Sequence, residues 1–176
     1  MRYIITTIIF FRFFLTVSSQ INADSLYNVA LTMGKNGEYN NAIEICKNLL
    51  KLYPDRYDIM VFLSNVYGWK GDYEKALSYI EESYRINHYN EELYDTWLNL
   101  LLWSKDYKKL IDIIDLAKQN NYSNNYNMLY KKLLAYKYLG ETDKAIKLVD
   151  ENKQYLDSTK IKSIYNELVM NNRKQS

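Results

Sequence analysis

Apolar residues recur along residues 24–170 at the spacing of amphipathic helices, and short polar turns separate these helices in pairs. The clearest pair covers residues 57–90. Its first helix is predicted to bury positions spaced i, i+3, i+4 and i+7, and its second helix a similar stripe. Gly71 lies between them and permits the left-handed backbone that a tight turn needs. The positions predicted to be buried in this pair are Met60, Leu63, Ser64, Tyr67, Ala76, Ile80 and Ser83.

The same pattern is written four times. Ala42, Ala76 and Leu110 are spaced 34 residues apart, and Ala145 follows after 35. The pattern predicts an all-α fold, a right-handed α-solenoid of four helical hairpins with a C-terminal capping helix. The predicted repeat domain covers residues 24–170, with units at about 23–56, 57–90, 91–124 and 126–159, a cap at 160–170 and a polar tail at 171–176.

The other hairpins are predicted to bury equivalent stripes, and the cap to cover the last apolar face. In chain order these positions are Leu26, Val29, Ala30, Met33, Ala42, Ile45, Cys46, Leu49, Leu129, Leu133, Tyr136, Ala145, Val149, Ile161, Ile164, Tyr165, Leu168 and Val169. Cys46 is the only cysteine. It either replaces an apolar residue in the core or pairs with another chain.

The third hairpin departs from the pattern. Leu98 and Leu110 replace small residues, and Lys105 replaces the turn glycine. A non-glycine residue in the left-handed region costs on the order of 1 kcal/mol. Asp106 is expected to cap the following helix, and residues 119–127 are expected to form the longest loop of the repeats.

Residues 1–23 differ from the rest of the chain. A basic start precedes a 14-residue apolar run, and a small polar stretch then ends at Ala23. This order is typical of a signal peptide cleaved after Ala23, and the run is shorter than the roughly 20 residues that span a bilayer. Arg12 inside the run leaves two alternatives open, a retained N-terminal anchor and an unusual cytosolic N-terminus.

Charge and composition exclude several classes of function. Without Arg2 and Arg12 the chain carries 21 basic and 21 acidic residues, so no basic stripe for a nucleic acid is expected. His88 is the only histidine and lies in a predicted turn. No glycine-rich phosphate loop or catalytic arrangement is present, so we expect no enzyme activity, no metal and no cofactor.

The repeats resemble tetratricopeptide repeats in the alanine of the second helix, the turn glycine, the tyrosine after it and the period near 34. A narrower resemblance links residues 62–76, 97–107 and 129–140 to the repeats that precede the barrel of YaiO-type outer-membrane proteins, which often carry a tryptophan just before the turn, as Trp69 and Trp103 do here. That resemblance implies a periplasmic repeat domain attached to an outer-membrane barrel. Nothing after Met170 resembles barrel strands, so a barrel would belong to another chain or have been lost.

In a tetratricopeptide stack the first helices line a concave groove. By register, the groove positions are Tyr27, Asn65, Trp69, Asp95, Asn99, Trp103, Tyr130 and Tyr138. Trp69, Trp103 and Tyr138 share one position and are expected to form an aromatic ladder, or else to fill space between neighbouring hairpins. Asn65 and Asn99 also share a position, and an asparagine side chain can bond both backbone groups of an extended peptide.

These features favour a non-catalytic scaffold or adaptor in the bacterial cell envelope that binds a peptide or protein segment in its groove. The alternative is an auxiliary periplasmic domain of an outer-membrane barrel or polysaccharide-export system, with the groove contacting glycan. We expect an exported protein, periplasmic or associated with the outer membrane, with no transmembrane span in the mature chain.

Overall fold

The computed structural model describes residues 23–175, together with the side chains of residues 23–172. The chain divides into two compact units at residues 86 and 87, and each is described by itself. Of the leader predicted over residues 1–23, only Ala23 falls among the described residues.

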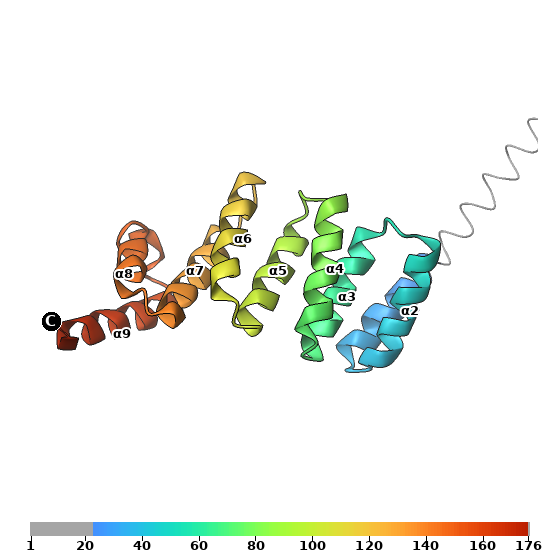
Figure 1. Ribbon diagram of the computed structural model, residues 1–176, viewed down its shortest axis with the longest axis horizontal. Helices are drawn as coiled ribbons and strands as arrows, with labels where there is room; N and C mark the ends of the chain where they lie inside the picture. Colours follow the sequence, from blue (N-terminus) through green and yellow to red (C-terminus); the bar gives the residue numbers. More distant parts are fainter. Residues whose placement is uncertain (1–22, 176) are drawn as a thin grey trace, which may run out of the picture. The chain divides into compact units, whose positions relative to one another are not determined.

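The first unit is a stack of paired helices. Residues 23–35 are helical, and α2 (Tyr39–Leu52), α3 (Tyr57–Trp69) and α4 (Tyr73–Ile86) follow. Helix α3 packs against both α2 and α4 (Figure 1). Because α3 has neighbours on two sides, it is apolar over most of its surface, and nine of its residues are buried.

Small side chains let α3 and α4 approach closely. Ser64 and Ala76 are both fully buried, and Ser83 Oγ donates a hydrogen bond of 3.1 Å to the carbonyl of Tyr57. All seven buried positions predicted for this hairpin are confirmed. Cys46 is also buried in α2, as the core interpretation predicts, and burial raises the pKa of its thiol to about 12.

The predicted buried stripe of the first helix is wrong at two positions. Leu26 and Val29 are 43% and 42% exposed. The helix turns a different face toward α3: Tyr27 donates a hydrogen bond to the carbonyl of Asp58, and Gly34 lies so near Phe62 that an added Cβ would come within 2.7 Å of its ring. This packing points Leu26 and Val29 outward.

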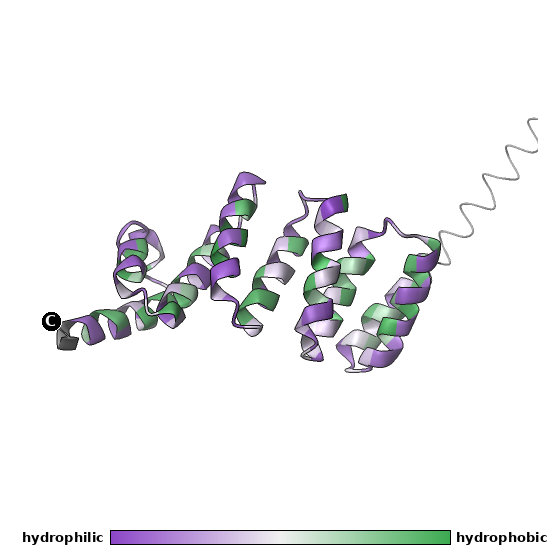
Figure 2. Ribbon diagram, viewed as in Figure 1, coloured by the Kyte–Doolittle hydropathy of each residue, from purple (hydrophilic) through white to green (hydrophobic). Residues whose placement is uncertain are grey.

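The second unit contains five α-helices within its described residues. They are α5 (Glu91–Trp103), α6 (Tyr107–Gln119), α7 (Asn125–Leu139), α8 (Thr142–Asp150) and α9 (Thr159–Gln175), with a short 3-10 helix, η1 (Lys153–Tyr155), between the last two. Helix α7 contacts α5, α6, α8 and α9. Figure 2 shows the alternation of apolar and polar faces along these helices.

Helix α9 covers the apolar side of the last hairpin. Ile161 and Leu168 join a buried cluster with four residues of α7 and α8, namely Leu129, Leu133, Ala145 and Val149. Ile164 and Tyr165 pack against the same cluster. The predicted capping helix is therefore present. The all-α prediction is also confirmed, because residues 23–175 contain helices and turns without a strand.

The four hairpin turns share one backbone conformation. Gly37, Gly71, Lys105 and Gly140 have φ values of 84°, 80°, 61° and 74°. In each turn the following residue donates a backbone hydrogen bond across the end of the first helix, as Asp72 does to the carbonyl of Tyr67 at 2.9 Å. This is the Schellman arrangement, which satisfies carbonyls that a helix end otherwise leaves unpaired. The predicted left-handed Lys105 is confirmed, and Asp106 caps α6 by accepting from Lys109 N.

The connection between α6 and α7 is shorter than predicted. Helix α7 begins at Asn125, and Asn124 caps it by accepting from Asn127 N. Asn121 adopts a second non-glycine left-handed conformation, with φ 61°. The stretch between α8 and α9, residues 151–158, is the longer connection.

The turn geometry generates a stability prediction. Lys105→Gly should raise the free energy of unfolding by about 0.5–1 kcal/mol, because relief of the left-handed strain outweighs the added freedom of the unfolded chain. Gly71→Lys should lower it by about 1 kcal/mol, since a Cβ at Gly71 meets no atom within 4 Å and only the backbone is strained. Urea unfolding followed by circular dichroism measures both. Changes of the same sign in the two variants would contradict the proposed cause.

Candidate functional site

The candidate site consists of the groove positions on the first helices of the hairpins. In the first unit these are Tyr27, Asn65 and Trp69. Tyr27 is half-buried and its hydroxyl is engaged with the carbonyl of Asp58 at 3.1 Å. Asn65 is half-buried on α3. Of the three, Trp69 is the residue left exposed, at 42%.

Trp69 is supported from two sides by aromatic rings. Its ring centroid lies 6.1 Å from that of Tyr39, the first residue of α2, and 6.3 Å from that of Phe62 in an edge-on arrangement. The preceding hairpin therefore braces the tryptophan while one part of the indole stays open. Such pairs contribute about 0.5–1.5 kcal/mol beyond the area that they bury.

A charged cluster lies beside Tyr27. Arg56 forms two hydrogen bonds with Asp58, at 2.8 and 2.7 Å, and one with Asp24 at 2.8 Å, and its guanidinium lies 5.6 Å from the Tyr27 ring centroid. Burial works against ionisation of Asp58, but the two bonds from Arg56 outweigh it, so the pKa of this carboxyl is lower than usual. The cluster links the first helix to the start of α3.

In the second unit, Asp95 belongs to a hydrogen-bond network. One carboxylate oxygen accepts from the Tyr122 hydroxyl and from Asn127 Nδ2, which lies 2.6 Å away. Burial of Tyr122 and its bond to the carboxylate together raise the pKa of that phenol. The network joins α5 to the start of α7 and to the loop before it.

Asn99 accepts a hydrogen bond from a buried lysine. Lys131, on α7, is only 6% exposed, and its Nζ lies 2.6 Å from Asn99 Oδ1. Burial lowers the pKa of this ammonium, and the attraction of Asp95 opposes the change. The two predicted polar groove residues of this unit, Asp95 and Asn99, are thus already bonded within the chain.

The aromatic groove residues of the second unit are more open. Trp103 and Tyr138 are 40% and 57% exposed. Tyr138 stacks on Tyr107, the first residue of α6, with ring centroids 5.0 Å apart. Tyr130 is half-buried and stacks with Tyr126 at 6.4 Å.

Sequence reasoning missed the partners of the groove residues. Lys131, Tyr122 and Asn127 carried no recognisable signal, because each lies outside the repeated positions. The supporting tyrosines did carry one: Tyr39, Tyr73 and Tyr107 recur at the same 34-residue period as the groove residues. Two of them, Tyr39 and Tyr107, lie against an aromatic residue at the end of the next first helix. Trp69 and Tyr138 therefore each pack against the preceding hairpin and remain partly exposed.

Other kinds of site find little material here. Between residues 23 and 175 no group of three His, Cys, Asp or Glu side chains is placed to hold a metal ion. His88 lies in the turn before α5, half-buried, with its carbonyl accepting from the Tyr94 hydroxyl. In the same range no helix combines the length and the apolar character that crossing a membrane requires.

The paired helices, their repeated turns and the braced aromatic residues define a helical repeat protein. Residues 35–93 match the tetratricopeptide repeat family. No curated protein matches the chain in sequence. Proteins built from tetratricopeptide repeats are typically non-catalytic scaffolds that bind protein partners.

Solved structures share this fold. A crystal structure of MamA aligns with a TM-score of 0.65 and 19% identity over 86% of this chain and 88% of that one. A tetratricopeptide repeat protein from Parabacteroides merdae aligns with a TM-score of 0.71 and 16% identity over 85% and 60%. A thermophilic tetratricopeptide protein from Thermus thermophilus aligns with a TM-score of 0.61 and 16% identity over 85% of this chain and 82% of that one. The predicted fold class, a solenoid of tetratricopeptide-like hairpins, is confirmed.

The buried lysine generates a prediction on pH. The pKa of Lys131 is lower in the folded chain than its usual value near 10.4. Between these two pKa values the unfolded chain binds more protons than the folded chain. The contribution of Lys131 to the free energy of unfolding therefore rises with pH in that range. The difference in unfolding free energy between wild type and Lys131→Met should therefore shift in favour of wild type as the pH rises toward the ordinary lysine pKa of about 10.4.

Urea unfolding at several pH values measures this difference. The raised pKa values of Cys46 and Tyr122 weaken both proteins alike at high pH, so their effects cancel in the comparison. A difference that stays constant, or that moves toward the variant, would show that burial does not control the titration of Lys131.

Proposed function

We propose that this chain is a non-catalytic scaffold of the bacterial cell envelope that binds a peptide or protein segment through the aromatic residues at the ends of its first helices. One observation carries the proposal. Trp69, Trp103 and Tyr138 stay 40–57% exposed at one repeated position. Large aromatic residues left open at a surface are typical of sites that carry binding energy.

The support beneath these rings favours recognition. Trp69 lies against Tyr39, and Tyr138 stacks on Tyr107. A braced ring loses little freedom when a partner binds, and binding energy is then not spent on ordering the site. Each unit thus offers its own prepared aromatic surface.

The polar groove residues have a different role in this proposal. Asp95 and Asn99 are bonded to Tyr122, Asn127 and Lys131, so they hold α5 and α7 together. A partner would meet them as an ordered polar surface beside the aromatic residues. The alternative partner is a glycan, which could stack on the same exposed aromatic rings. The first test below distinguishes a glycan from a protein partner.

The envelope assignment rests on the leader. A basic start, an apolar run and a small polar stretch ending at Ala23 support export. The narrower resemblance to YaiO-type repeats supports the same compartment and remains a prediction.

The first test is capture of a partner from envelope extracts with the chain as bait. Trp69→Ala and Trp103→Ala, singly and together, should reduce recovery of a saturably bound protein, with a loss of at least about tenfold for the double variant. Tyr89→Ala removes a 68% exposed tyrosine outside the proposed surface and is the matched control. Circular dichroism checks that each variant is folded.

Equal recovery with the double variant and with wild type would overturn the proposal. A glycan array run with the same variants separates the alternative: glycan binding lost in the double variant, with no protein captured, would favour the polysaccharide assignment.

The second test concerns the leader. Expression of the full chain in a bacterium should yield a mature protein whose N-terminus is Asp24, found in the periplasmic or outer-membrane fraction and detected by intact mass and N-terminal sequencing. Ala23→Phe should block processing, because a bulky side chain does not fit where a small residue is required. An uncleaved wild-type chain in the membrane fraction would instead establish the retained anchor.

A further inference from the structure

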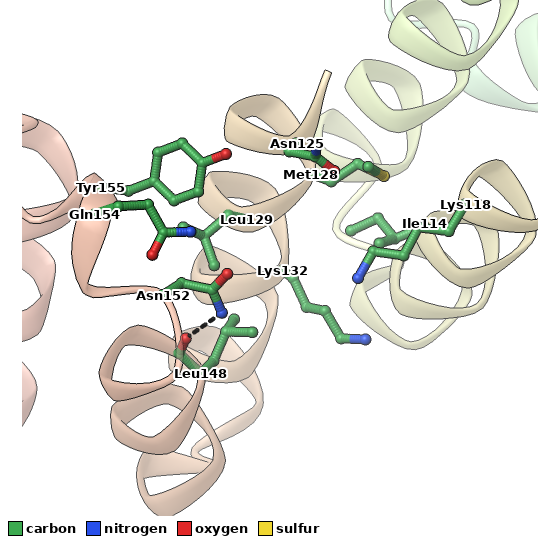
Figure 3. A pocket seen from close by; sticks show the side chains of 10 residues that line it. All are labelled: Ile114, Lys118, Asn125, Met128, Leu129, Lys132, Leu148, Asn152, Gln154 and Tyr155. Atoms are coloured by element: carbon green, nitrogen blue, oxygen red, sulfur yellow. Dashed lines mark hydrogen bonds between the residues drawn. The ribbon is translucent and has the colours of Figure 1, made fainter. Parts of the chain in front are cut away.

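The second unit contains a pocket that is separate from its aromatic surface. The pocket has a volume of about 260 Å³ and lies at the junction of α6, α7, α8 and the 3-10 helix η1 (Figure 3). On α7 it uses Asn125, Met128, Leu129 and Lys132. At 100° per residue the centre of this set lies roughly 110–130° around the helix from Lys131 and Tyr138. The pocket and the aromatic surface are therefore distinct features of one helix.

The floor of the pocket is apolar. Ile114 is fully buried, and Met128 and Leu129 are 1% and 6% exposed. Leu148 from α8 completes this floor. An apolar side chain placed against these residues would leave water, which contributes about 25 cal/mol per Å² of apolar area buried. The volume is smaller than the roughly 300–1,000 Å³ of drug-sized sites and suits one side chain with part of its backbone.

The rim of the pocket carries positive charge and amide groups. Lys132 is paired with Asp115 at 2.9 Å. The side-chain ammonium of Lys118 has no hydrogen bond or ion pair with any other described residue. In Figure 3 the side chains of both lysines extend into the space between α6 and α7. The lining contains no Asp or Glu, and the acid beside the rim, Asp115, is paired with Lys132.

Amide groups offer further bonds at the rim. Asn152 donates to the carbonyl of Leu148 at 2.8 Å, which fixes its orientation and leaves its oxygen open. Gln154 is exposed and lines the same opening. Backbone groups of a bound peptide would find donors and acceptors here, as a peptide segment requires.

The first unit provides an internal comparison. A pocket of about 320 Å³ occupies the equivalent junction of α2, α3 and α4, with Lys47 and Lys51 in its lining. There Lys51 bonds to Asn48 at 3.1 Å and Lys47 lies over the Tyr67 ring at 5.8 Å. Glu82 also lines it. The repeat thus forms this junction in both units, but an acid-free lining with an uncommitted cation is found at the second.

We propose that the pocket between α6, α7 and α8 is a second peptide-binding site, which takes an apolar side chain flanked by a carboxylate. The apolar side chain occupies the floor formed by Met128 and Leu129, and the carboxylate pairs with Lys118. The charge and the apolar floor together select an acidic, apolar segment over a neutral or basic one. The site goes beyond the aromatic surface and does not depend on it.

The test uses the full chain labelled with ¹³C at the methionine methyl groups. Met128 reports the pocket, Met60 the equivalent pocket of the first unit and the exposed Met170 general effects. Resonances are assigned with Met-to-Leu variants. The probe is the blocked peptide Ac-Asp-Leu-Asp-NH2. Its matched partners are Ac-Asn-Leu-Asn-NH2, which lacks the charge, and Ac-Asp-Ala-Asp-NH2, which lacks the apolar anchor.

We expect the acidic peptide to shift Met128 with a Kd on the order of 1 mM, as suits a ligand of this size. Both partner peptides should bind about tenfold more weakly. Lys118→Gln should abolish the preference for the acidic peptide. Lys108→Gln, which removes an exposed lysine from the same helix outside the pocket, should keep it.

Three results would overturn the proposal: no shift at Met128, equal shifts with the acidic and the amide peptides, or an acidic preference that survives Lys118→Gln. An equal shift at Met60 would also overturn the proposal, because the pocket beside Met60 lacks an equivalent of the unpaired Lys118 ammonium. Trp103→Ala should leave the titration unchanged, which separates a failure here from a failure of the aromatic surface.

Discussion

The structure depends on a chain reversal that is repeated four times. At each reversal one residue takes a left-handed backbone conformation, and the next residue donates across the end of the first helix. The reversal fixes where the second helix starts, and therefore which of its side chains face the first. Where the turn residue is glycine the conformation carries no steric cost, and where it is Lys105 the packing of the hairpin has to offset the strain.

The consequence of fixed turns is fixed register between hairpins. Tyr39 and Tyr107 each begin a second helix, directly after a turn. Each lies against an aromatic residue in the last turn of the following first helix, Trp69 and Tyr138 respectively. The same left-handed turn thereby positions an equivalent pair of aromatic rings in each unit. The exposed edges of these rings, which the proposed function uses, are a by-product of the same geometry.

Periodicity predicted the fold because it reports local packing that every hairpin repeats. All seven positions that spacing predicted to be buried in residues 57–90 are buried, and Lys105 was identified because it stood where glycine was expected. The first helix was mispredicted for the same physical reason. Leu26 and Val29 fit a helical stripe, but contacts with Asp58 and Phe62 on α3 decide which face turns inward, and spacing within one helix contains no information about that choice.

The candidate site was predictable only in part. Register predicted eight groove positions, and the structure leaves Trp69, Trp103 and Tyr138 among them exposed. Register could not predict the hydrogen bonds that Tyr122, Asn127 and Lys131 donate. Tyr122 lies in a loop, and the residue types of Asn127 and Lys131 are not repeated in the other hairpins. Asp95 and Asn99 look available in the sequence, yet each already accepts a hydrogen bond from within the unit. Whether a polar groove residue is free for a partner depends on its neighbours in space.

The two pockets at the helix junctions show that neighbouring residues also decide the chemistry of a whole site. A repeat architecture produces equivalent hollows, since the same three helices meet in each unit. Their chemistry diverges through a few substitutions: Leu50 in the first pocket corresponds by register to Lys118 in the second, and Glu82 lines the first alone. The second helix differs between them, since α4 has 14 residues whereas α8 has 9 residues and is followed by η1, and the lining of the second pocket contains no acid. In a fold whose geometry is set by repetition, specificity has to come from positions where the repeats differ, and these positions are where a search for function should begin.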